Sequence, residues 1–130
     1  MEYTNLDVWI ESRKLTNIVY NSTKNYPKEE IFGLTNQIRR CAVSVPSNIA
    51  EGCGRNTSKE TIHFLFIARG SIYELETQLY LSLDQNYIEK EEFGNILSQV
   101  ILCKKLLNGF INYYKTDANT ILGTHLGGMV

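Results

Sequence analysis

The sequence predicts an all-α fold, an antiparallel up-down-up-down bundle of four helices. Three observations predict it. Apolar residues recur at intervals of three and four along four separate blocks, which is the period of an amphipathic helix. Short segments separate the blocks, so neighbouring helices are expected to run in opposite directions. No block shows the alternation of period two that a half-buried strand needs.

The first helix is expected from about Leu6 to Asn25. Thr4 and Asp7 stand three residues apart, the spacing of a capping box that satisfies the free N–H groups of a helix start. Pro27 follows the block, and a proline disfavours helical geometry in the residue before it. The predicted inner stripe consists of Val8, Ser12, Leu15, Val19, Ser22 and Tyr26.

The second helix is expected to begin directly after Pro27. Glu29 and Glu30 then lie in its first turn, where acids complement the positive end of the helix dipole. Pro46 lies inside the pattern and removes one backbone hydrogen bond, so a kink is expected there. The stripe consists of Ile31, Leu34, Ile38, Cys41, Val45 and Ile49, broadened by Phe32, Ala42 and Val43.

The third helix opens with a second capping box, formed by Thr57 and Glu60. Gly52 and Gly54 precede it, and we expect these glycines to end the second helix in left-handed geometry. The loop at residues 84–86 closes the third helix. Its inner seam consists of Ile62, Leu65, Ile72, Leu75, Leu79 and Leu83.

This helix also carries more apolar residues than one core can hold. Successive residues turn by about 100° around a helix, so the additional side chains cannot all point inward. On a single chain they would form an exposed hydrophobic patch, which soluble proteins usually bury against a partner. The predicted interface of a homo-oligomer therefore consists of Phe64, Phe66, Ile67 and Leu81. The number of subunits does not follow from these residues.

The fourth helix is expected to complete a bundle over residues 1–115. Acids gather at its start and lysines near its end, which suits the helix dipole. Its stripe consists of Phe93, Leu97, Val100, Cys103, Leu107, Phe110 and Tyr114. Residues 116–130 contain three of the nine glycines, and we expect a tail there without secondary structure of its own.

Composition limits the class of protein. The 130 residues suit one domain, and a net charge of −1 excludes a uniformly basic nucleic-acid binder. The apolar runs are far shorter than the roughly 20 residues of a membrane span. The first residues show no signal peptide, and three cysteines would leave one thiol over in a secreted protein. The expected location is therefore the cytoplasm.

Two stretches of the sequence are characteristic of a family. Residues 37–52, which include Pro46-Ser47-Asn48, and residues 64–76 closely resemble four-helix-bundle proteins encoded within intervening sequences of bacterial large-subunit rRNA genes. The resemblance covers nearly all of residues 6–115. Members of this family are similar in shape to the accessory protein of diversity-generating retroelements, a five-subunit barrel with a basic surface that works with a reverse transcriptase and its RNA. The resemblance therefore implies a homopentamer, and it supplies no catalytic residues.

Charge is unevenly distributed along the chain. Residues 31–70 have a balance of +3, whereas residues 71–103 have a balance of −5. In an assembly the basic residues would repeat in every subunit and offer guanidinium groups to the phosphates of RNA. Alternatively, the arginines pair with Glu51, Glu74 or Glu76 within or between subunits. The candidate nucleic-acid-binding residues are Arg39, Arg40, Arg55, Lys59 and Arg69.

No catalytic or metal site is expected. The possible metal ligands match no zinc-binding spacing, and they are Cys41, Cys53, His63, Cys103 and His125. Arg55 and His63 are separated by seven residues, more than the four to six of some helical-bundle RNases. The sequence thus predicts a non-catalytic homo-oligomeric scaffold without a cofactor, whose partners are structured RNA or a nucleic-acid-processing protein. The alternatives are an adaptor that binds only proteins and a helical-bundle RNase.

Overall fold

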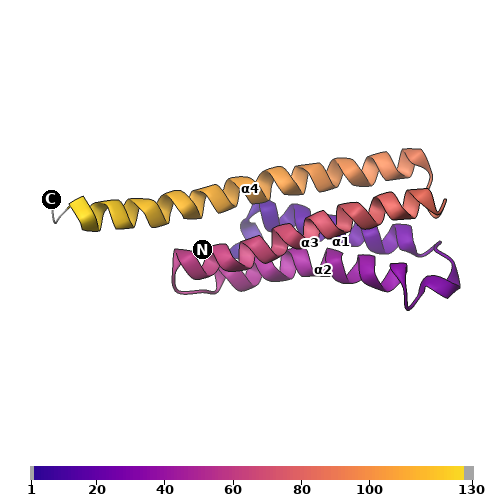
Figure 1. The fold of residues 1–130 in the computed structure, drawn as a ribbon, viewed down its shortest axis with the longest axis horizontal. Coiled ribbons are helices and arrows are strands. Elements are labelled where there is room, and N and C mark those ends of the chain that lie inside the picture. Colours follow the sequence, from indigo (N-terminus) through magenta and orange to yellow (C-terminus); the bar gives the residue numbers. More distant parts are fainter. Residues whose placement is uncertain (1, 128–130) are drawn as a thin grey trace.

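The chain folds into four helices. The computed structural model describes residues 2–127, and the side chains of residues 2–117. Helices α1 (Asp7–Thr23), α2 (Leu34–Cys53), α3 (Ser58–Asp84) and α4 (Lys90–Gly127) lie side by side (Figure 1). Short 3-10 turns precede α1 at Tyr3–Asn5 and α2 at Lys28–Glu30, and the described residues contain no strand. The predicted all-α fold of four helices is confirmed.

One core holds the four helices together. Helix α1 packs against α2 and α4, and α3 packs against the same two helices. The inner side chains bury their apolar surface almost completely, and this burial is the main source of stability. The largest of them include Leu15, Ile38, Ile49, Leu65, Ile72, Leu75, Leu79, Ile96, Leu107 and Ile111.

Hydrogen bonds show the relative direction of α2 and α3. The hydroxyls of Ser44 and Ser71 lie 2.8 Å apart, and the Thr61 hydroxyl donates to the Gly52 carbonyl at 2.8 Å. The partners rise along α2 as they fall along α3, so these two helices run in opposite directions. The ribbon in Figure 1 shows the short turn that joins them.

Pro46 lies inside α2, where the apolar pattern places it. Proline has no N–H, so the carbonyl of Ala42, four residues earlier, loses its helical partner. The Thr16 hydroxyl of α1 donates to this carbonyl at 2.8 Å. A side chain of the neighbouring helix thus replaces the missing bond. The bend at Pro46 stays a prediction.

The predicted capping box of the first helix and the predicted start of the second helix need correction. Thr4 lies in a 3-10 turn, and Leu6 occupies the N-cap of α1 without a side-chain hydrogen bond, so the first capping box does not form. Helix α2 begins at Leu34, because Gly33 before it adopts a non-helical conformation (φ −114°, ψ −118°). Glu29 and Glu30 therefore lie in the preceding 3-10 turn and not in the first turn of α2.

This later start changes the environment of two apolar residues. Ile31 was expected in the inner stripe and is 56% exposed, and Phe32 is 93% exposed. Both residues precede α2, so the helical register that would turn them inward does not reach them. The inner stripe of α2 begins at the partly buried Leu34, and Ile38 is the first of its residues to be fully buried.

The turn between α2 and α3 confirms one expectation and overturns another. Thr57 caps α3, since its hydroxyl accepts the Glu60 N–H at 3.1 Å. Gly52 and Gly54 are not left-handed: Gly52 lies inside α2, and Gly54 has a φ of −85°. Glycine is needed at position 52 for space, because an added Cβ would lie 3.1 Å from the Thr61 carbonyl oxygen. Asn86, with a φ of 61°, supplies the left-handed residue of the turn between α3 and α4.

Helix α4 is longer than expected and reaches Gly127. The expectation that residues 116–130 lack secondary structure is therefore wrong for residues 116–127. A glycine in a helix costs only about 1 kcal/mol relative to alanine, and α4 already contains Gly94 and Gly109. None of the helices described combines the length and apolar character needed to cross a bilayer.

Candidate nucleic-acid interface

Arg39 is held between α1 and α2. Its Nε donates to the Thr23 hydroxyl at 2.7 Å, and its Nη2 donates to the Tyr20 carbonyl at 3.4 Å. The guanidinium carbon also lies 4.8 Å from the centre of the Tyr20 ring, a distance typical of a cation–π contact. All of these partners are neutral, so the positive charge of Arg39 is fixed in place without being neutralised.

Arg40, the next residue, is exposed on α2. It lines two hollows, one on each side of the helix. The first lies between α1 and α2, has a volume of about 580 Å³ and also contains Tyr20 and Arg39. The second lies between α2 and α3, has a volume of about 480 Å³ and also contains Glu74. Arg39 and Arg40 thus form one pair of cations, as their adjacent positions predict.

Arg55 and Lys59 meet at the turn between α2 and α3. They line a hollow of about 560 Å³ together with His63 and Phe64. The Arg55 guanidinium lies 4.5 Å from the centre of the Phe64 ring and forms an ion pair with Glu51.

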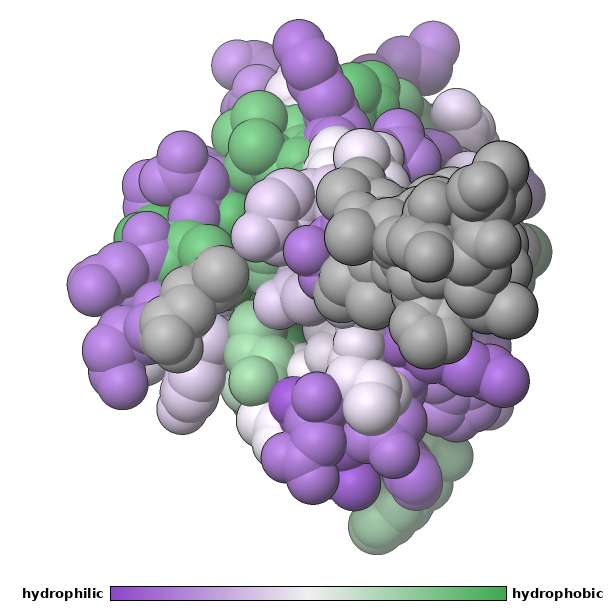
Figure 2. Space-filling model, turned by 90° about the vertical axis from the view of Figure 1, so that its left-hand side faces the viewer, coloured by the Kyte–Doolittle hydropathy of each residue, from purple (hydrophilic) through white to green (hydrophobic). Residues whose placement is uncertain are grey.

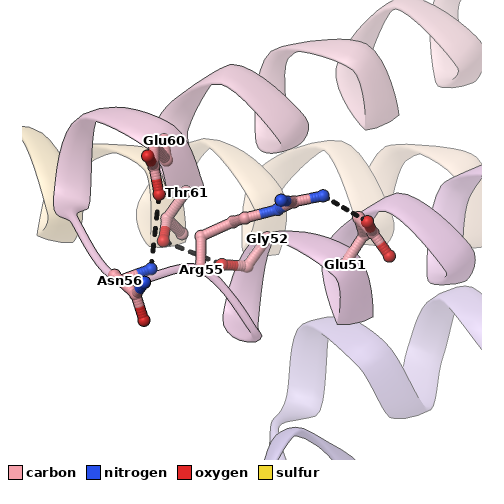
Figure 3. A network of polar contacts seen from close by, with 6 residues as sticks. All are labelled: Glu51, Gly52, Arg55, Asn56, Glu60 and Thr61. Carbon is pink, nitrogen blue, oxygen red and sulfur yellow. Dashed lines mark hydrogen bonds and ion pairs between the residues drawn. The ribbon is translucent and has the colours of Figure 1, made fainter.

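Hydrogen bonds hold this turn in place (Figure 3). The Glu60 carboxylate accepts the Asn56 N–H at 3.4 Å, and the Gly52 carbonyl accepts the Thr61 hydroxyl. Arg55 is therefore carried by a turn that hydrogen bonds hold against α3, and Lys59 lies at the start of α3 directly after it.

Arg69 lies apart from the other four cations, on the side of α3 that faces α4. Its Nη1 donates to the Asn108 side chain at 3.3 Å, and it lies 4.7 Å from the centre of the Phe66 ring. The Lys115 ammonium lies 5.2 Å from the same ring. The sequence offered Lys115 only as a charge near a helix end, and its place beside Arg69 depends on the packing of α4.

The five candidate cations therefore occupy three positions and do not form one continuous strip. Arg40 lies about 20 Å from Cys53 at the end of α2, at 1.5 Å per residue, and Arg55 follows beyond that end. The ion pairs among the described residues are Lys14–Glu11, Arg55–Glu51 and Lys104–Glu76. Arg55 is thus the one candidate cation with a carboxylate partner in this part of the chain. The proposed pairing of Arg39, Arg40 and Arg69 with acids does not occur within the described chain.

The candidate oligomer interface on α3 is largely exposed. Phe66 is 38% exposed, Ile67 40% and Leu81 46%, whereas Phe64 is partly buried beneath Arg55. Two further members of this surface, Tyr73 and Tyr80, are half exposed and were not among the predicted interface residues. The sequence does contain a pattern that predicts them: Phe66, Tyr73 and Tyr80 follow one another at intervals of seven residues, which places all three on one side of the helix. We call this surface the outer face of α3; it consists of Phe66, Ile67, Tyr73, Tyr80 and Leu81.

The possible metal ligands do not form a cluster among the described side chains. Among the side chains that the structure describes, no three His, Cys, Asp or Glu residues gather as metal ligands would. His63 is exposed, and His125 lies outside the described side chains. Burial raises the pKa of the Cys103 thiol to about 11, and it raises the pKa values of Cys41 and Cys53 as well. Thiols with raised pKa values are poor nucleophiles at neutral pH.

Known proteins place this bundle in a family. A family model described as the 23S rRNA-intervening sequence protein matches residues 4–109. The structure is similar to that of a protein of unknown function from the S23 ribosomal protein family of Bacteroides thetaiotaomicron, with 26% sequence identity and a TM-score of 0.74. The similarity covers 81% of this chain and 95% of that chain. No curated protein matches the sequence. Since the family match spans most of its length, the chain belongs to the 23S rRNA-intervening sequence protein family.

Proposed function

We propose that this protein is a non-catalytic scaffold of several identical subunits that binds structured RNA through its basic residues. The observation that carries the proposal is the state of the five candidate cations. Four of them, Arg39, Arg40, Lys59 and Arg69, have no carboxylate partner in an ion pair among the residues that the structure describes. Their charge is therefore available to phosphate groups, which bind arginine in a bidentate way.

Assembly would multiply this charge. A single chain carries separate pairs of cations at Arg39–Arg40 and at Arg55–Lys59, and each pair can contact few phosphates. Several subunits would repeat both pairs, and affinity for RNA rises with the number of phosphates that a protein neutralises. The outer face of α3 supports assembly, because its apolar side chains stay exposed on one chain. Five subunits is the number that the family resemblance implies.

The end of the molecule that contains the α2–α3 turn has a surface suited to a polar partner. Figure 2 shows this end as largely hydrophilic, with smaller hydrophobic areas between the polar ones. Arg55 belongs to this turn, and Lys59 lies in the first turn of α3 that follows it.

RNA binding can be tested by a salt titration with labelled structured RNA. The logarithm of the wild-type binding constant should fall linearly with the logarithm of salt concentration, because binding releases counterions. The double variant Arg40→Gln/Lys59→Gln removes two exposed cations and should reduce both the affinity and the slope. The matched control Lys24→Gln/Lys90→Gln removes the same charge at exposed positions outside the candidate set. If the wild type shows no binding at low salt, or if both variants bind equally, RNA binding through these residues is wrong.

The absence of catalysis needs its own experiment, because Arg55 and His63 line one hollow. An RNase would use the imidazole as a general acid or base. Labelled RNA should stay intact in the presence of the wild type. Cleavage by the wild type that disappears in His63→Ala would establish the RNase alternative.

A further inference from the structure

The hollow between α2 and α3 is rich in polar groups. Its volume is about 480 Å³, and both helices contribute to its walls. The lining residues that matter here are Phe32, Asn36, Gln37, Arg40, Glu74 and Gln78. It therefore offers charged groups, amides and one aromatic ring to the same small volume.

The two charges in this hollow do not neutralise each other. Arg40 and Glu74 both line it, yet they form no ion pair within the described chain. The Glu74 carboxylate accepts a hydrogen bond from the Cys41 thiol at 3.4 Å, and a thiol is a weak donor. The exposed Glu74 can therefore accept stronger hydrogen bonds from a ligand, while Arg40 can bind an anionic group.

Gln78 adds an acceptor that lacks a partner. The residue is 9% exposed, and its Oε1 is buried without a donor among the residues that the structure describes. A buried polar atom without a hydrogen bond is costly, so such atoms usually have partners in the functional state. Gln78 lines the hollow, and the terminal amide torsion of glutamine is broad, so a rotation of this amide changes which of its atoms faces the hollow.

Phe32 supplies a ring at the rim. It is 93% exposed, the most exposed of the large apolar side chains described. Exposed aromatic rings stack on the unpaired bases of RNA, which are then recognised through hydrogen bonds along their edges. A site with a free ring, a free carboxylate and a free guanidinium has the parts that such recognition uses.

We propose that this hollow binds one unpaired guanine of the RNA. Guanine has two adjacent donors on its Watson–Crick edge, N1–H and N2–H₂, which match the two oxygens of Glu74. Its O6 would accept from the amides of Asn36 or Gln37, its ring would stack on Phe32, and a neighbouring phosphate would bind Arg40. The inference rests on the proposed function and adds to it the nucleotide that the RNA presents.

The other bases fit the carboxylate less well. Adenine and cytosine each place a ring nitrogen acceptor beside their amino group, and this acceptor would face the Glu74 oxygens and repel them. Uracil has a single N–H donor between two carbonyls. Guanine is therefore the standard base that donates two adjacent hydrogen bonds to one carboxylate.

The test uses hairpin RNAs that share one stem and differ at a single loop nucleotide: guanine, inosine or adenine. Fluorescence anisotropy with the wild type should show binding to the guanine loop about tenfold tighter than to the adenine loop, the discrimination expected of a bidentate contact. Inosine lacks the N2 amino group and should bind with intermediate affinity. Glu74→Gln should abolish the preference, whereas the matched control Glu91→Gln, also at an exposed position, should keep it.

Each remaining outcome has a definite meaning. Equal binding of all three loops overturns the guanine site and leaves RNA binding intact, whereas binding of none overturns the proposed function itself. A preference that persists in Glu74→Gln also overturns the site. If that variant does not fold, Phe32→Ala replaces it, and an unchanged affinity of Phe32→Ala for the guanine loop overturns the site, because stacking on this ring should strengthen binding. If free guanosine monophosphate binds as tightly as the guanine loop, the hollow is a site for a free nucleotide and the assignment to RNA is wrong.

Discussion

The two faces of α3 differ in burial although both are apolar. Leu65, Ile72, Leu75 and Leu79 of the inner face are almost completely buried, while the outer face, with Phe66 and its neighbours, is 38–50% exposed. The inner face is covered by α2 and α4 of the same chain. The outer face is covered only in part within one chain, where Tyr80 packs against Phe93 of α4 and Tyr73 lies beneath Lys104 of α4. The apolar area that stays exposed is explained if copies of the protein cover it for one another.

Removing an inner side chain should have the largest effect on folding. Leu75→Ala leaves a cavity in the core and should lower the free energy of unfolding by about 2–5 kcal/mol. Urea denaturation followed by circular dichroism measures this change. The loss should be the same at every protein concentration.

Leu81→Ala is the matched substitution on the outer face. It should lower stability only at concentrations where copies associate, because the side chain has no role in the core of one chain. A loss as large as that of Leu75→Ala, and independent of concentration, would contradict the distinction between the two faces.

Gly52 tests how closely α2 approaches α3. In Gly52→Ala the new Cβ would lie 3.1 Å from the Thr61 carbonyl oxygen and 3.2 Å from the Phe64 Cβ. We expect a destabilisation of about 1–3 kcal/mol from overpacking, reduced by the better helix propensity of alanine. Gly94→Ala is the control, since nothing lies within 4 Å of its added Cβ, and it should raise the thermal midpoint. The same sign for both variants would show that the close approach is not limiting.

Substitution of Thr57 tests the start of α3. Thr57 is the N-cap of this helix and lies between Arg55 and Lys59 in the sequence. Thr57→Ala removes the acceptor of the Glu60 N–H and should cost about 1 kcal/mol. Thr57→Ser keeps a hydroxyl and should cost little. The thermal midpoints of the two variants provide the comparison, and equal midpoints would mean that the cap contributes nothing.

The smallest expected effect is a difference in thiol reactivity between the buried Cys103 and the partly buried Cys41 and Cys53. At pH 8 a thiol reagent should modify the half-buried Cys41 and Cys53 slowly, and Cys103 only after unfolding, because burial raises the Cys103 pKa to about 11 and little thiolate is present. The time course of modification in the native state should therefore end at two thiols. Three thiols reacting at one rate would contradict the burial of Cys103.

Helical periodicity was sufficient to predict most of the fold. It identified four helices, the Thr57 cap and the turn after Asp84, because these depend on residues close in sequence. It failed at Ile31, where the apolar spacing continues but the conformation of Gly33 delays the helix.

The candidate site was harder to predict, because a charge on a helix has several possible partners. The sequence left open whether Arg39 contacts RNA or pairs with an acid, and within the described chain its partners are Thr23 and Tyr20 of α1. Which groups meet depends on how the helices pack, and residue spacing along one helix contains no such information. The hollow around Glu74 and Gln78 was missed for the same reason, since its two walls come from different helices.

The most direct test of the central claim is the molar mass in solution, measured by light scattering. We expect the wild type to form an assembly of several chains, five by the proposal, and Phe66→Ser/Leu81→Ser to form folded single chains with unchanged helical circular dichroism. A wild type with the mass of one chain, or a double variant with the mass of the wild type, would contradict the assignment of the outer face of α3 to assembly.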